Sequence, residues 1–157
     1  MKIPALVLPI ALAAAACGGP TDPSTEPVSF THAVSFGFCD PRGYCSSRLE
    51  LRPRLAVMTW ESRERGAVVE RRALDAAQWS RVSGALDPEG LRALPDVVGC
   101  PDCADGGAES LRVAFGDGQA DAVTFEYGDE VAGIEALVDA LREIRSSFDP
   151  PPPSALP

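Results

Sequence analysis

The stretch Val28-Ser-Phe-Thr-His-Ala-Val-Ser-Phe-Gly-Phe38 alternates large, mostly apolar residues with small or polar ones. Alternation with a period of two is typical of a β-strand that buries one face. The residues expected on the buried face are Val28, Phe30, His32, Val34, Phe36 and Phe38. We therefore predict a strand over 28–38 that packs against the core.

Further strands are predicted on both sides of a helical region. Residues 49–59 are expected to form a strand in which Pro53 marks an edge or a bulge, since proline cannot donate to a sheet ladder. The residues of this strand that share one parity are Leu49, Leu51, Leu55, Val57 and Thr59. The polar stretch 61–66 predicts a hairpin loop into a strand over 67–72. A second hairpin is expected over 111–127, around a Gly-Asp-Gly turn.

Helix start signals define the remaining elements. Asp75 with Gln78 three residues later forms the pattern of a capping box, and Asp87-Pro88 is typical of a short second helix. A third helix is expected to begin near Asp129, with an apolar stripe made of Ile134, Leu137, Val138, Leu141, Ile144 and Phe148. Together these elements predict an α+β fold: a mostly antiparallel sheet of four or five strands, stapled by disulfides, with two or three helices on one face.

The chain begins with a segment typical of exported proteins. Lys2 precedes an apolar run that ends in Ala14-Ala-Ala-Cys17, as a secretory signal does. The stretch Ala14–Cys17 resembles the lipobox of bacterial lipoproteins, although that family prefers Leu where Ala14 stands. The resemblance implies that signal peptidase II cleaves before Cys17 and that Cys17 carries a lipid such as palmitate. The same alanines also fit an ordinary signal peptidase site, which would release a soluble secreted protein.

This interpretation divides the chain into four parts. Residues 1–16 are the expected signal peptide, and residues 17–27 form a Pro/Gly/Ser/Thr-rich tether. Residues 28–148 are expected to form a single α+β domain, and 149–157 a disordered Pro-rich tail. In Gram-negative lipoproteins an Asp after the lipidated Cys marks retention in the inner membrane. Gly18 at that position implies an outer-membrane anchor facing the periplasm.

The charge pattern excludes some classes of partner. The formal net charge is −9, and residues 96–149 hold 13 acids against three Arg. Such an acidic half argues against nucleic-acid binding and against docking on anionic lipid. The expected partners are the bilayer, through the lipid on Cys17, and an envelope protein.

Four cysteines remain after lipidation of Cys17. In an exported domain they are expected to form two disulfides among Cys39, Cys45, Cys100 and Cys103. The sequence leaves open whether they pair locally or across the two loops. A zinc site with four Cys ligands and redox chemistry at Cys100-Pro-Asp-Cys103 are the alternatives. Nearby carboxylates disfavour a redox thiolate, because they raise the pKa of a thiol.

The segment Cys100–Glu109 is a candidate ligand site. Asp102, Asp105 and Glu109 flank Gly106 and Gly107, and carboxylates at this density suit Ca2+ or Zn2+. The alternative is that Asp and Gly only form turns here. The surrounding run 99–107 also resembles a feature of small exported bacterial proteins, a resemblance that implies no activity.

No catalytic pattern stands out in the rest of the chain. His32 is the only histidine, and on an apolar strand face we expect it to be packed rather than catalytic. Tyr44, between Cys39 and Cys45, is a candidate contact for a partner, because an exposed aromatic in a closed loop can anchor one. We expect no cofactor.

The function predicted is a non-catalytic binding or accessory domain of an envelope lipoprotein. The alternatives are a metal-binding or enzymatic module that uses Cys100–Glu109, and a purely structural envelope protein.

Overall fold

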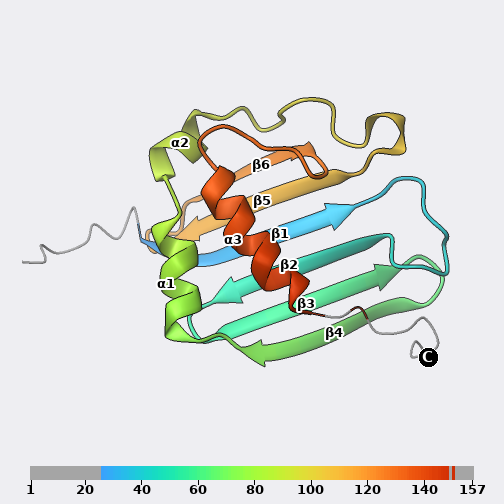
Figure 1. Cartoon of the computed structure of the whole chain (residues 1–157), viewed down its shortest axis with the longest axis horizontal. Helices are drawn as coiled ribbons and strands as arrows, with labels where there is room; N and C mark the ends of the chain where they lie inside the picture. The colour runs from blue at the N-terminus through green and yellow to red at the C-terminus, as the bar shows by residue number, and fades with distance from the viewer. Residues whose placement is uncertain (1–25, 149, 151–157) are drawn as a thin grey trace, which may run out of the picture.

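The computed structural model of the chain describes residues 26–148 and 150. The predicted signal peptide, Cys17 and nearly all of the predicted tether and tail lie outside the described residues. The described part is an α+β fold with one antiparallel sheet of six strands and three α-helices (Figure 1). The predicted fold class is confirmed, and the sheet has more strands than the four or five expected.

The strand predicted from the alternating stretch lies inside the sheet. This strand, β1 (Pro27–Ser35), has β2 and β5 as neighbours in the order β4-β3-β2-β1-β5-β6. The other strands are β2 (Ser46–Arg52), β3 (Leu55–Ser62), β4 (Gly66–Ala73), β5 (Ala108–Phe115) and β6 (Ala120–Glu126). Every pair of neighbours is antiparallel, so hairpins and one longer connection through the helices suffice to build the sheet.

The alternation in β1 is confirmed in the middle of the strand and wrong at its ends. The buried residues of β1 are Phe30, His32 and Val34. Phe38 is 80% exposed, because the strand ends at Ser35 and the Phe36 N–H donates to the Cys45 carbonyl where the chain leaves the sheet. Val28 is 45% exposed and lies at an irregularity in the pairing of β1 with β5.

Residues 49–59 form parts of two strands rather than one. Arg52 pairs with Leu55, so Pro53 and Arg54 alone connect β2 to β3. Arg54 has a φ of 69°, a left-handed conformation that lets the chain reverse within two residues. Residues paired across strands share a face, and this reversal turns the other set of β3 side chains toward the core. The parity shared by Leu49, Leu51, Leu55, Val57 and Thr59 therefore does not continue as one face through the turn. The buried residues of β3 are Ala56, Met58, Trp60 and Ser62.

The helices begin at the predicted caps, except for the last one. Helix α1 (Ala76–Gly84) has the capping box of Asp75 and Gln78, and α2 (Pro88–Ala93) begins after Asp87 with Pro88 in its first turn. Helix α3 (Glu135–Ser146) begins later than Asp129, because the chain first makes turns in which Gly133 has a φ of 92°. The buried stripe of α3 is Leu137, Val138, Ala140, Leu141 and Ile144.

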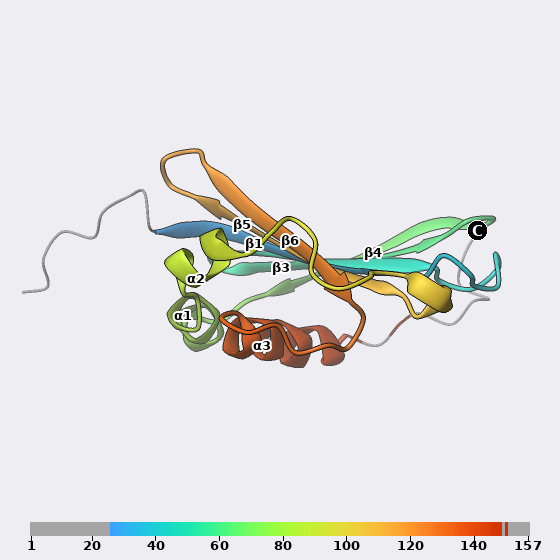
Figure 2. The same cartoon turned by 90° about the horizontal axis from the view of Figure 1, so that it is seen from above.

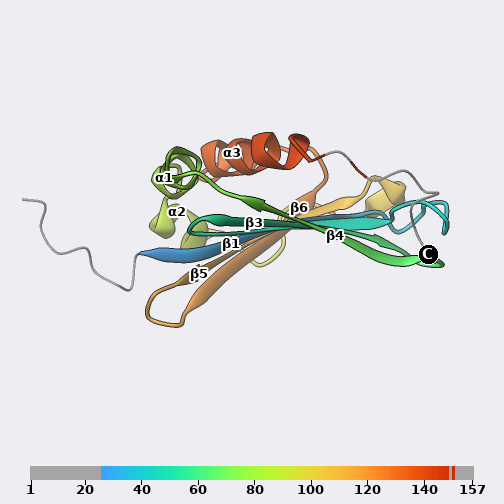
Figure 3. The same cartoon turned by 90° about the horizontal axis from the view of Figure 1, so that it is seen from below.

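The molecule has two layers. Helices α1 and α3 lie on the same face of the sheet, as the two side views show (Figures 2 and 3), and α3 runs across the middle strands (Figure 1). The core fills the space between this face and the helices, and it includes Phe30, Leu49, Trp60 and Leu141. Among the described residues, no helix is long and apolar enough to cross a membrane.

Candidate functional site

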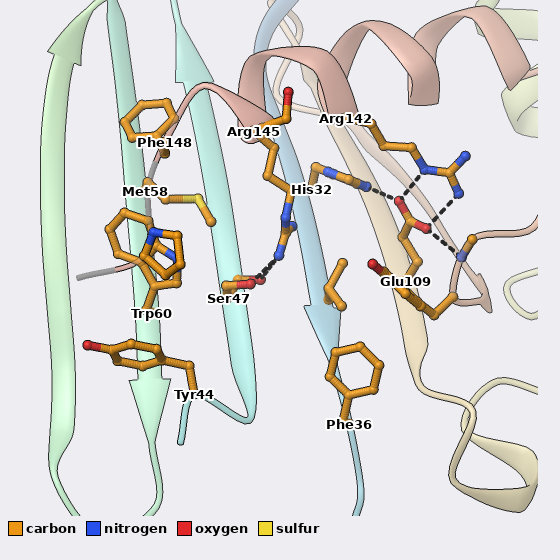
Figure 4. A pocket seen from close by; sticks show the side chains of 15 residues that line it. His32, Phe36, Tyr44, Ser47, Met58, Trp60, Glu109, Arg142, Arg145 and Phe148 are labelled. Carbon is orange, nitrogen blue, oxygen red and sulfur yellow. Dashed lines mark hydrogen bonds and ion pairs between the residues drawn. The ribbon is translucent and has the colours of Figure 1, made fainter. Parts of the chain in front are cut away.

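A cavity of about 760 Å³ lies between the C-terminal end of α3 and the sheet (Figure 4). It is partly open to solvent, and its wall combines aromatic and charged side chains. The residues that line it are His32, Val34, Phe36, Tyr44, Ser47, Met58, Trp60, Glu109, Tyr127, Gly128, Arg142, Arg145, Ser146, Phe148 and Pro150.

The floor of the cavity is one row of side chains across four strands. Strand pairing places Glu109 opposite Val34, Val34 opposite Ser47, and Ser47 opposite Trp60. Paired residues share a face, so all four point toward α3. Ser47 is the smallest of them and occupies the position where Leu49 and Leu51 fill the core further along β2. The hollow exists because the short Ser47 side chain stands in a row whose other side chains are larger, so the space above Ser47 is not filled.

A buried ion network forms the wall on the β5 side. Glu109 is 1% exposed, and its carboxylate accepts hydrogen bonds from Arg142 Nε at 3.0 Å and Arg142 Nη2 at 2.7 Å. His32 Nε2 contacts the same carboxylate, and the Gly128 N–H donates to it at 3.1 Å (Figure 4). A buried carboxylate with this many donors is fully satisfied, which makes the network a rigid part of the wall.

The network holds opposite charges at neutral pH. Burial alone would raise the pKa of Glu109, but hydrogen bonds from His32 and Arg142 outweigh it and lower the pKa to about 2. Burial lowers the pKa of His32, and the hydrogen bond to Glu109 opposes this only in part. The network is therefore a carboxylate paired with the Arg142 guanidinium, with a neutral imidazole beside them.

Arg145 is the second guanidinium of the site and has no carboxylate partner among residues 26–148 and 150. It comes from the last turn of α3, and Figure 4 shows its side chain directed at Ser47. Its Nη2 donates to the Ser47 hydroxyl and, at 3.5 Å, to the Ser47 carbonyl. Burial lowers the pKa of Arg145. This pKa starts so high that the group remains a cation, so the cavity wall carries one positive charge more than Glu109 balances.

Three buried polar atoms at this cavity have no hydrogen-bond partner among the residues that the structure describes. They are His32 Nδ1, the Tyr44 hydroxyl and Arg145 Nη1, and all three residues line the cavity. Buried polar atoms are normally paired in folded proteins, and leaving one unpaired costs about 1–3 kcal/mol. Three such atoms around one hollow point to a ligand or ordered water as the missing partner.

Tyr44 was predicted to contact a partner from an exposed loop, and the structure places it elsewhere. The residue is half-buried, packs against the core and lines the cavity. It occupies this position because the Cys45 N–H donates to the Glu61 carbonyl, which draws the end of the loop onto β3. Tyr44 remains a candidate binding residue, with the cavity rather than the outer surface as its setting.

The structure does not bring the predicted metal ligands together. Asp102 accepts hydrogen bonds from the backbone N–H groups of Gly37 and Gly107, at 3.1 and 3.2 Å. Asp105 is exposed, whereas Glu109 belongs to the buried network. Within the described part of the chain, no group of three or more His, Cys, Asp or Glu side chains is placed to hold a metal ion.

The four cysteines pair locally. Disulfides join Cys39 to Cys45 and Cys100 to Cys103, with Cα atoms 5.6 and 5.4 Å apart. The predicted disulfides are thus present, and the pairing that the sequence left open is within each loop rather than between loops. Cys39–Cys45 closes the loop that carries Tyr44, which gives this disulfide a place beside the cavity.

Comparison of this chain with family models, curated proteins and solved structures finds no match. The cavity in the structure and the export signal predicted from the sequence are therefore the two features on which a functional proposal can rest.

The buried network makes stability depend on pH in a defined direction. Folding lowers the pKa of both His32 and Glu109, so the unfolded chain binds more protons in acid and the folded state loses stability as pH falls. We expect thermal stability to decrease below about pH 6.5 through His32, and again between about pH 4.5 and 2 through Glu109.

Circular dichroism melts between pH 8 and 2 measure this dependence. The variant His32→Gln should flatten the upper part of the curve and leave the lower part in place. The groups that face His32 are Glu109, Arg142 and Arg145, and none of them titrates between pH 5 and 8. A melting temperature that rises on acidification from pH 7 to 5 would show that His32 is not held neutral.

Proposed function

We propose that this protein is a lipid-anchored, non-catalytic binding module of the cell envelope that holds a small, mainly apolar ligand in the cavity beneath α3. The observation that carries the proposal is the cavity itself. Its volume of about 760 Å³ is in the range of small-molecule sites, which are typically apolar with a few convergent polar groups. The aromatic wall and the three unpaired polar atoms match that description.

The anchor is the second part of the proposal and rests on the sequence. The resemblance of Ala14–Cys17 to a lipobox supports lipidation of Cys17, and the Pro/Gly-rich residues that follow suit a tether. By the same resemblance, Gly18 favours the outer membrane, facing the periplasm. A tethered module of this kind would bind its ligand, or present it to an envelope partner, close to the membrane surface.

Intact mass measurement of the mature protein tests the anchor. We expect a mass that begins at Cys17 and includes a diacyl or triacyl adduct, with four cysteines that alkylate only after reduction. An unlipidated mass with a free thiol at Cys17 would overturn the anchor, and the module would then be a soluble secreted protein.

Fluorescence titration with the neutral apolar dye N-phenyl-1-naphthylamine tests the cavity. The dye should become emissive with the wild-type mature protein, and Ser47→Leu should weaken its binding at least tenfold by filling the hollow. The matched control is Ser29→Leu on the opposite face of β1, which should bind like wild type. Absence of binding would favour the purely structural alternative. A calorimetric titration with Ca2+ or Zn2+ that gives heat would instead favour the metal-binding alternative.

A further inference from the structure

We infer that the ligand of this cavity is an amphipathic monocarboxylate whose carboxylate pairs with Arg145. This inference rests on the proposed function, because it requires that the cavity bind a small molecule. It adds the sign and chemical class of the ligand's polar group, which the shape of the cavity alone does not define.

The charge balance of the wall indicates an anion. The charged side chains that line the cavity are Glu109, which is buried, and Arg142 and Arg145, which are half-buried. Glu109 is already matched to Arg142 through two hydrogen bonds. His32 is neutral at pH 7, since burial lowers its pKa. Within residues 26–148 and 150, one positive charge of the wall therefore remains without a counter-charge. A monoanion neutralises it, whereas a neutral ligand leaves it unpaired and a cation adds to it.

The geometry of Arg145 indicates a carboxylate. Ser47 holds Nη2 of the guanidinium with its hydroxyl and its carbonyl, which orients the planar group. Nη1 has no partner in the described part of the chain. A guanidinium donates through a fixed fork that fits the two oxygens of a carboxylate. The Tyr44 hydroxyl, which likewise has no partner among the described residues, is a further donor in the same wall.

The remaining wall indicates an apolar body on the ligand. Figure 4 shows Met58, Trp60 and Phe148 on one side of Arg145, with Phe36 between Tyr44 and Glu109. The Phe36 ring packs edge-on against Tyr127, and the Trp60 ring packs edge-on against Phe148. These pairs form two aromatic walls around the cation. An acid with an alkyl or aryl chain would pair its charge with Arg145 and bury its chain between them.

Three ligands with the same ten-carbon chain test the inference by displacing the naphthylamine dye from the full mature protein. They are decanoate, 1-decanol and decyltrimethylammonium, all below their micellar concentrations. We expect decanoate to displace the dye with a Kd at least tenfold lower than that of 1-decanol, and the ammonium to be the weakest. Arg145→Gln should remove the advantage of decanoate over 1-decanol, and Arg145→Lys should keep part of it.

Arg112→Gln is the matched control, because Arg112 lies on the opposite face of β5, between buried Leu111 and Val113. It should change no affinity, and melting temperatures will show that each variant is folded. Equal displacement by all three ligands would overturn the inference and leave the proposed function standing. A decanoate advantage that survives Arg145→Gln would also overturn it. Failure of the dye itself to bind wild type would instead refute the proposed function.

Discussion

Replacement of Glu109 by glutamine is expected to lower the free energy of unfolding by about 3 kcal/mol. The change leaves Arg142 without its counter-charge inside the wall, and it replaces one of the two acceptor oxygens of residue 109 with an NH2 donor that faces other donors. Removing one partner of a buried ion pair costs about 3–5 kcal/mol, and Arg142 keeps some solvent contact, so we expect the lower end. Urea denaturation of wild type and variant, followed by circular dichroism, measures the difference.

Glu130→Gln is the control for this prediction. Glu130 is exposed, so the same change of charge should alter stability by no more than about 0.5 kcal/mol. A loss of less than about 1 kcal/mol on Glu109→Gln would contradict the view that the network is a rigid part of the cavity wall.

Phe30→Ala is expected to have an equally large effect, about 3–5 kcal/mol, because it empties a position in the middle of the core. Phe30 is fully buried on β1, where its ring packs edge-on against Trp79 of α1. Its neighbour Thr31 lies on the opposite face of the same strand and is only half-buried. Thr31→Ala should therefore cost less than about 1 kcal/mol.

The two variants are compared by the midpoint of urea unfolding at constant slope. Similar losses for Phe30→Ala and Thr31→Ala would mean that β1 does not have one buried and one solvated face. That result would contradict the alternation from which the fold was predicted.

The parts of the fold that follow from local patterns could be predicted from the sequence. The period-two alternation around Phe30 and the capping box of Asp75 each depend on neighbouring residues, and both are present in the structure. The turn at Pro53-Arg54 was missed because the apolar residues on either side of it keep one parity. The pattern 49–59 therefore looks like one interrupted strand. Only the register of β2 against β3 shows that the chain reverses there.

The candidate site was harder to predict, because its parts are distant in the sequence. Glu109 contacts His32 across 77 positions and Arg142 across 33. A local signal did exist for Glu109: it shares the parity of the buried residues Leu111, Val113 and Phe115. The dense acids and glycines before it favoured a metal loop instead. The contact between Arg145 and Ser47 has no signal in the sequence, because it depends on how α3 packs on the sheet.

The hollow above Ser47 is proposed to be a ligand site, and a crystal structure of the mature protein grown with decanoate would show whether it is one. We expect density for an alkyl chain between the two aromatic walls, with its carboxylate within hydrogen-bond distance of Arg145. A cavity that is empty, that is closed by its own side chains or that is filled by residues 151–157 would contradict the claim.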